Sequence, residues 1–282
     1  MKRTFYRCAI AALFAAGVGS NAAADTLNFT GGSAMGGPDV PTPVTFGTLS
    51  GAYFEVGSLH PAGTGVFNPF LTIQEKGTEQ GYNTLGKLQF DEKRQPQWTH
   101  ELLLSSLKVV TAPNGTQSYE FTLDLDEADT VKKRLISLDE LQIYRGAAPD
   151  YHQLDTAAMK FTDSGAVANL VYDMDAANDN TVLLNYDVIS RGNGASDLNV
   201  YIATSAFAGS GPYVYLYSKF GTYGQAGFDY TTDASYEEWR AVSGANPPQA
   251  VPVPTAVYGG FVLLGGLALS KIRARKLALQ GC

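Results

Sequence analysis

Cysteine is almost absent from this sequence of 282 residues, and its two cysteines, Cys8 and Cys282, lie close to the ends. The long stretch between them has no thiol, which excludes disulfides and thiolate chemistry from any domain it forms. Histidine is also scarce. His60, His100 and His152 stand in separate segments, and no two of them have the spacing of a zinc site.

Positive charge is the next shortage. The chain has 20 Lys and Arg against 27 Asp and Glu, and seven of the cations lie before residue 25 or after residue 270. Subtracting those seven from 20 leaves 13 cations against 27 anions, so the middle has a formal charge of −14. Because phosphate backbones are bound by clustered Lys and Arg, nucleic acid is excluded as a main partner.

Short motifs for serine-hydrolase, phosphate or dinucleotide chemistry are missing as well. Residues 31–36 come near the G-x-S-x-G pattern, but the closing glycine stands one residue too far on. Residues 192–194 have no helical segment after them and are typical of a hairpin turn. The sequence therefore predicts a protein that is not an enzyme and has no organic cofactor.

What the chain has in plenty is apolar, aromatic and glycine residues. Hydrophobic residues make up 45 % of it and aromatic residues 11 %, and there are 30 glycines. This composition allows a sizeable core and favours short strands joined by tight turns. We predict one all-β domain over residues 25–244, a two-sheet sandwich or jelly roll, followed by a linker at 245–250.

The expected strands are short and are separated by turn signals. The clearest hairpin joins residues 102–110 to 118–125 through an Asn-Gly turn, and alternation in the second arm predicts one buried and one wet face. Helix is expected only near 130–134 and 156–160. The other expected strands cover residues 52–56, 70–73, 138–144, 170–172, 181–189, 198–202 and 213–218.

The first 24 residues have the composition of a secretion signal. Lys2, Arg3 and Arg7 precede an apolar run, and a series of alanines ends at Ala24 before Asp25. The apolar run is shorter than the roughly 20 residues that a membrane-spanning helix needs. We therefore expect export, with cleavage by signal peptidase between Ala24 and Asp25.

The other end carries an uncharged segment and then a basic cluster. Residues 251–270 are uncharged and close to the roughly 20 residues of a transmembrane helix, although two prolines shorten the helical part. The cations that follow predict a cytoplasmic end and a domain outside the inner membrane. These cations are Lys271, Arg273, Arg275 and Lys276.

This order of features resembles the PEP-CTERM sorting signal of Gram-negative bacteria that make exopolysaccharide. The resemblance covers about the last thirty residues, and its proline motif is Val251, Pro252, Val253 and Pro254, with Val253 where glutamate is usual. It implies an exosortase that recognises and removes the tail. It also implies a transient anchor in the inner membrane and delivery to the cell surface or the exopolysaccharide matrix.

Oxygen-bearing side chains gather in one segment between two expected strands. They are Asp173, Asp175, Asn178, Asp179 and Asn180, and hard cations such as Ca²⁺ take such ligands. The spacing is not that of an EF-hand, because Asn178 stands where glycine is required. Asp and Asn are also ordinary turn residues, so a calcium site and a solvated turn both stay open.

Two further patterns bear on sugar chemistry. Glu237 and Glu238, beside a tryptophan, are the pair for a glycoside hydrolase, although the same segment fits a final core strand. Positions 213, 215 and 217 alternate onto one face, which belongs either to the core or to an open sheet. The tyrosines that would stack on sugar rings if exposed are Tyr201, Tyr213, Tyr215, Tyr217, Tyr223 and Tyr230.

Together these patterns predict an exported envelope or matrix protein with a structural or interaction role. The first alternative is a carbohydrate-binding module, with or without calcium, and the second is a polysaccharide-acting hydrolase. A solvent-facing stripe of tyrosines favours the first alternative, and opposed carboxylates in a deep cleft favour the second. A closed core with neither feature favours the structural role.

Overall fold

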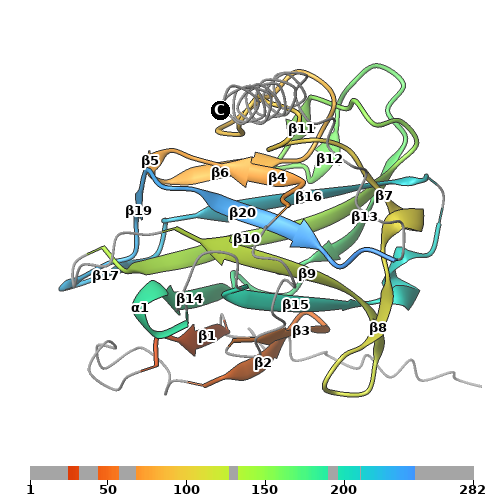
Figure 1. Cartoon of the computed structure of the whole chain (residues 1–282). Helices are drawn as coiled ribbons and strands as arrows, with labels where there is room; N and C mark the ends of the chain where they lie inside the picture. The colour runs from red at the N-terminus through yellow and green to blue at the C-terminus, as the bar shows by residue number, and fades with distance from the viewer. Residues whose placement is uncertain are drawn as a thin grey trace, which may run out of the picture.

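The computed structural model describes residues 25–31, 44–56, 68–126, 133–189, 196–209 and 211–244. Strands dominate these ranges, which confirms the all-β class (Figure 1). Helix is limited, in the described ranges, to three short pieces. They are η1 (Leu104–Ser106), α1 (Tyr186–Ile189) and η2 (Thr204–Phe207).

Seven strands form sheet A: β1 (Thr26–Phe29), β6 (Glu79–Tyr82), β7 (Leu102–Leu103), β10 (Leu135–Gly146), β13 (Ala168–Asp173), β14 (Thr181–Asn185) and β16 (Tyr213–Phe220). Their order is β1-β14-β10-β16-β6, with β13 paired to β10 and β7 to β16. The β1–β14 pair is parallel, and the other pairs of the sheet are antiparallel.

Seven more strands form sheet B: β2 (Phe46–Leu49), β3 (Ala52–Glu55), β4 (Leu71–Ile73), β8 (Val109–Thr111), β9 (Gln117–Leu125), β15 (Leu198–Ala203) and β20 (Glu237–Ala241). Their order is β2-β3-β15-β9-β20-β4, with β8 paired to β9. All of these pairs are antiparallel, so the segment at 237–241 is indeed a core strand of this sheet.

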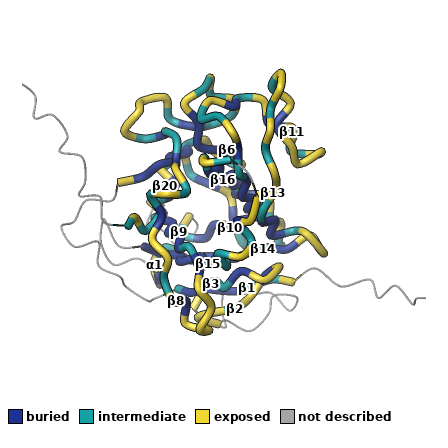
Figure 2. The backbone as a smooth tube through the Cα atoms, turned by 90° about the vertical axis from the view of Figure 1, so that its right-hand side faces the viewer, coloured by how far each residue is buried: buried dark blue, intermediate teal, exposed yellow. Residues whose placement is uncertain are grey.

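The two sheets pack face to face around a common core, and buried residues concentrate between them (Figure 2). Phe121 and Trp239 of sheet B and Ile143 and Leu216 of sheet A have no exposed surface there. The indole N–H of Trp239 donates to Ser218 Oγ of sheet A at 3.0 Å. This bond joins the two sheets and satisfies a donor that would otherwise be costly to bury.

Three short two-stranded ladders lie outside the two large sheets. They are β11 (Leu154–Asp155) with β12 (Lys160–Phe161), β17 (Gly224–Gln225) with β18 (Phe228–Asp229), and β19 (Thr232–Asp233) with β5 (Lys76–Gly77). The β11–β12 ladder lies on the outer side of sheet A, away from sheet B (Figure 2). Its role in covering that face is described below.

The hairpin expected at the Asn-Gly turn exists, but its first arm is shorter than predicted. Only Val109–Thr111 pairs with β9, and Gly115 at the turn has the left-handed φ of 87° that glycine tolerates. Leu102–Leu103 pairs with β16 of sheet A instead, because the chain changes sheets at η1. The outer side of β9 is not wet as expected, since Glu120 and Thr122 are buried.

Two other local expectations were wrong. The strand predicted over 181–189 ends at Asn185, and the chain then turns through α1. The helix expected near 156–160 is the turn between β11 and β12. The remaining expected strands are present with ends shifted by a few residues, because pairing partners set strand ends and local sequence does not.

The predicted leader (1–24), the linker (245–250) and the sorting motif with its basic end (251–276) lie outside the described residues. So do residues 130–132 of the other expected helix. Within the described ranges, no helix has the length and apolar character to cross a membrane.

Candidate functional site

The acidic segment after β13 forms a turn whose oxygens accept hydrogen bonds from its own backbone. The Asp175 N–H donates to Asp173 Oδ1 at 3.1 Å, and the Asn180 N–H donates to Asp175 Oδ1 at 2.7 Å. Burial raises the pKa of Asp175 to about 7, and the charges of Asp173, Asp179 and Glu140 add to the rise. These are the hydrogen bonds of an Asx-type turn. A turn was the second of the two interpretations, a calcium site or a solvated turn, that the sequence left open.

Calcium binding at this turn stays a prediction. Asn180 donates its side-chain amide to the Met174 carbonyl and accepts from the Asp25 N–H, while Asn178 is half-buried and Asp179 is exposed. In the part of the chain that is described, no three His, Cys, Asp or Glu side chains gather closely enough to hold a metal ion.

A cavity of about 400 Å³ lies beside the same turn, at one end of the space between the sheets. Its walls include Ser50, Ala203, Ser205 and Ala206, and Asp173 is its one carboxylate. Val171, Tyr172 and Ile202 add apolar area, but Asp173 is the only charged side chain in the lining, so few groups could orient a ligand. The cavity is therefore a weaker candidate than the sheet face described below.

Glu237 and Glu238 do not oppose one another across a cleft. They are neighbours in β20 and alternate, so Glu238 lies on the outer face of sheet B while Glu237 is fully buried in the core. Glu237 meets Glu79 of β6 there, and the two carboxyl groups hydrogen-bond to each other. Such a bond requires a proton on one of them, and burial raises the pKa of Glu79 accordingly. A polymer cannot reach Glu237 while the sheets are closed.

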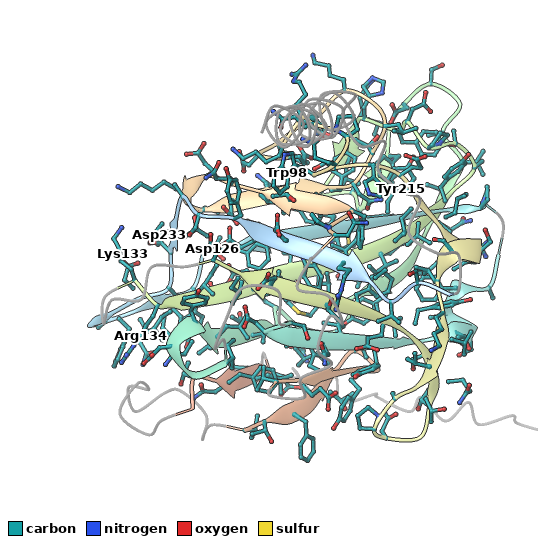
Figure 3. All side chains as sticks on the ribbon, viewed as in Figure 1. Trp98, Asp126, Lys133, Arg134, Tyr215 and Asp233 are labelled. Atoms are coloured by element: carbon teal, nitrogen blue, oxygen red, sulfur yellow. The ribbon has the colours of Figure 1, made fainter. Side chains whose placement is uncertain are left out.

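The tyrosine stripe on β16 lies on the outer face of sheet A, where Tyr215 and Tyr217 are buried and Tyr213 is half-buried. Phe161 of β12 lies over it, with its ring centroid 4.8 Å from that of Tyr215 (Figure 3 labels Tyr215). The Tyr215 hydroxyl donates to the Ala148 carbonyl at 2.6 Å, and Tyr217 donates to Gln80 at 2.7 Å. Of the two interpretations that the sequence left open, the structure supports core packing, and these rings cannot serve as a sugar platform.

The outer face of sheet B presents a different aromatic group, the aromatic row, formed by Phe46 of β2, Tyr53 of β3 and Tyr201 of β15. The Phe46 and Tyr53 rings lie 5.9 Å apart with an interplanar angle of 17°, and the Tyr53 and Tyr201 rings lie 6.1 Å apart. Phe46 is 60 % exposed and Tyr53 is half-buried. None of the described strands or helices lies across this face (Figures 1 and 2).

Local sequence explains why Phe46 points outward. Ser50 and Gly51 both have positive φ, 47° and 85°, as a two-residue hairpin turn between β2 and β3 requires. Alternation from that turn places Leu49 in the core and Phe46 on the outer face. Gly47 faces inward, where a Cβ atom would come within 2.3 Å of Leu27.

Carboxylates hold the inner end of the aromatic row. The Tyr201 hydroxyl donates to Glu55 Oε1 at 2.8 Å and also lies 3.4 Å from Glu120 Oε1. Burial raises the pKa of Tyr201, and the two carboxylates raise it further, so the hydroxyl keeps its proton. Next to this group, Arg240 Nε donates to Thr122 Oγ1 at 3.2 Å. The row is thus an apolar strip bordered by oriented polar groups.

Sequence reasoning found this site only in part. Tyr201 was among the candidate tyrosines and Tyr53 lay in an expected strand, but the strand that carries Phe46 was missed. The signal for it was present, because the Ser50-Gly51 pair follows the alternating segment at 46–49.

The remaining candidates do not assemble into a site. His100 Nδ1 lies 2.8 Å from the Glu101 carbonyl oxygen and His152 Nδ1 lies 2.8 Å from Asp163 Oδ1, in separate parts of the chain. His60 lies outside the described residues. Comparison with protein-family models, with curated proteins and with solved structures finds no match for this chain.

Proposed function

We propose that this protein binds polysaccharide without cleaving it, as an exported protein of the cell envelope or extracellular matrix. The observation that carries the proposal is the nearly parallel pair of Phe46 and Tyr53 on the outer side of sheet B, in which Phe46 is 60 % exposed. Sugar rings have apolar faces that pack on aromatic rings, and polar neighbours bind their hydroxyl groups. The proposal combines the interaction role expected from the sequence with the first alternative, a carbohydrate-binding module. The platform is formed by Phe46 and Tyr53 and not by the tyrosines of β16.

The cellular location is proposed from the sequence ends alone. The secretion signal and the PEP-CTERM-like tail support export across the inner membrane, transient anchoring, and release by an exosortase. The description of the body as a jelly roll likewise stays a prediction. Intact mass of the protein from membrane and medium fractions tests the location. A medium form from Asp25 to near Pro252 supports it, whereas a membrane form that keeps Lys271 to Cys282 contradicts release.

Binding can be tested by electrophoresis of the purified full-length chain in native gels that contain one polysaccharide each. The panel is hydroxyethyl cellulose, dextran and alginate. We expect at least one of them to retard the chain, and the Phe46→Ala and Tyr53→Ala variants to lose most of that retardation. Val167→Ala is the matched control, because Val167 is equally apolar and 52 % exposed but lies near the cover of sheet A.

Two results would overturn the proposal. One is migration unchanged by every polysaccharide in the panel. The other is retardation that Phe46→Ala and Tyr53→Ala leave intact, which would place the binding elsewhere on the molecule.

A further inference from the structure

Two neighbouring pockets lie where the chain after β6 meets the β11–β12 ladder and the segment before it, in the upper part of Figure 1. The small pocket has a volume of about 110 Å³ and the large pocket one of about 300 Å³, and Lys87 and Leu88 line both. The walls of the small pocket also include Arg94, Thr84 and Thr99. The large pocket is completed by Gln89, His152 and Gln153.

The charge of these pockets differs from that of the molecule around them. The middle of the protein has a strongly negative formal charge, yet no Asp or Glu stands among the described residues that line either pocket. The cavity beside the acidic turn, by contrast, has Asp173 in its wall. Lys87 and Arg94 therefore make the small pocket a positive site on an acidic protein.

The two cations of the small pocket differ from paired cations elsewhere in the fold. Lys219, for example, lies 3.0 Å from Glu140 in an ion pair. In the described part of the chain, the side chains of Lys87 and Arg94 have no ion pair and no hydrogen bond, and both residues are exposed. Two like charges around so small a space repel each other, and a bound anion removes that repulsion.

Hydrogen bonds fix the backbone next to Lys87. Thr84 Oγ1 donates to the Tyr151 carbonyl at 2.7 Å and accepts from the Gly86 N–H at 2.8 Å. Gly86 packs so closely at this point that a Cβ atom would lie 2.3 Å from the Asp150 carbonyl oxygen. This wall of the small pocket is therefore held against the segment that precedes the β11–β12 ladder.

The backbone on either side of Arg94 is held as well. The Lys93 N–H donates to the Thr72 carbonyl of β4 at 2.9 Å, and the Thr99 N–H donates to the Gln95 carbonyl at 3.2 Å. Both cations thus extend from fixed backbone positions. A site built on a fixed backbone loses less conformational freedom when a ligand binds.

Size and neighbouring groups define the ligand. A volume of about 110 Å³ suits an anionic group of a few atoms, since one water molecule takes about 30 Å³ in the liquid. The large pocket, at about 300 Å³, is at the lower limit for small-molecule sites. Its exposed Gln153 has an amide that can both donate to and accept from hydroxyl groups. A carboxylate on a ring that carries hydroxyl groups, as in a uronic acid, matches this arrangement.

We propose that Lys87 and Arg94 bind the carboxylate of a uronic acid residue, whose ring occupies the neighbouring large pocket. The ligand class is an acidic polysaccharide that presents such residues. This inference goes beyond the proposed function, because it concerns another surface and does not depend on Phe46 or Tyr53. It predicts binding that weakens as salt screens the exposed cations.

Calorimetric titration of the full-length chain at low ionic strength tests the inference. The probes are an alginate hexamer, which carries uronates, the neutral hexamer of the β-1,4-glucan, and inorganic phosphate. We expect the alginate hexamer to bind more tightly than phosphate. Lys87→Gln and Arg94→Gln should each weaken that binding about threefold to tenfold, because each removes one exposed charge contact. Neither variant should change the affinity for the glucan hexamer.

Lys108→Gln is the matched control, because Lys108 is also an exposed cation and lies just before β8. It removes the same charge at a distance and should change the alginate affinity by less than about twofold. Phe46→Ala should also leave that affinity unchanged, which separates this site from the aromatic row. Thermal unfolding of Lys87→Gln and Arg94→Gln should match that of the native chain, since both side chains are exposed.

Three results would overturn the inference and leave the proposed function untouched. The first is an alginate hexamer that does not bind. The second is an equal loss of affinity in Lys108→Gln, which would show a general effect of net charge. The third is phosphate bound at least as tightly as the hexamer, which would mean a site for small anions only. A loss confined to Phe46→Ala would place alginate on the aromatic row, which overturns this inference and supports the proposed function.

Discussion

The two outer faces of this molecule carry similar aromatic residues with opposite fates. On sheet A, Tyr82, Tyr144 and Tyr215 are buried beneath Phe161 of the β11–β12 ladder, and Tyr217 is buried beside Phe90. On sheet B, the Phe46–Tyr53 pair keeps exposed surface. An aromatic stripe on a strand is thus a candidate binding platform only where its rings keep exposed surface.

Truncating Phe161, which covers tyrosines on the outer face of sheet A, should have the largest effect on stability. The Phe161 ring contacts those of Tyr82 and Tyr144 at 5.4 Å each and that of Tyr215 at 4.8 Å. Phe161→Ala should lower the free energy of unfolding by about 3–5 kcal/mol, as for other buried aromatic deletions. Denaturant titration measures the loss. A change below about 1 kcal/mol would mean that the cover packs loosely and that the two faces are alike.

Raising the pH should destabilise the interior that both faces share. The Glu79–Glu237 bond needs a proton, and burial raises the pKa of Glu79 above its unfolded value. The stabilisation that this bond gives is therefore complete below the pKa of Glu79 in the unfolded chain. It is lost as pH rises through the pKa of Glu79 in the folded chain. We expect the free energy of unfolding to fall by an amount on the order of 1–3 kcal/mol across that pH range.

Glu237→Gln supplies the control for this pH dependence. Glutamine can donate to Glu79 without a shared proton, so thermal unfolding of the variant should depend less on pH than that of the native chain. An unchanged pH dependence would show that other buried carboxyls, such as Glu92 or Asp139, whose pKa values burial also raises, dominate it.

The sequence specified the class and the core strands of this fold better than the fate of either face. Alternation and turn signals located β3, β10, β15 and β16 because those signals are local. Burial of Tyr215 depends on Phe161, more than fifty residues earlier in the chain, and no local pattern encodes that contact. Likewise, the pairing of Glu237 with Glu79 follows from the way the two sheets pack, which no local pattern shows. From the sequence alone, Glu237 and Glu238 therefore resembled a catalytic pair.

Removing the hydroxyl of Tyr201 should moderately lower both the stability of the fold and the binding of polysaccharide. Tyr201→Phe deletes the bond to Glu55, and a bond to a charged group of this kind is worth about 1.5–3 kcal/mol. We expect that loss in unfolding experiments and a several-fold weaker retardation by polysaccharide, since Tyr53 packs against the Tyr201 ring. Retardation unchanged from the native chain would show that the hydroxyl does not position the platform.

The smallest expected effect on stability is that of Phe46→Ala. The side chain is 60 % exposed, so its truncation should change the free energy of unfolding by no more than about 0.5 kcal/mol. Denaturant titration beside Phe161→Ala gives a direct contrast between an exposed and a buried aromatic side chain. A loss comparable to that of Phe161→Ala would mean that Phe46 is a packing residue.

Hydroxyl-radical footprinting, with and without hydroxyethyl cellulose, tests the central claim most directly because it reads both faces of the full-length chain at once. The account predicts fast oxidation of Phe46 and slow oxidation of Tyr215 and Tyr217 in the free protein, with Phe46 and Tyr53 protected when the glucan is added. Oxidation of Tyr215 as fast as that of Phe46, or a glucan that protects neither Phe46 nor Tyr53, would contradict it.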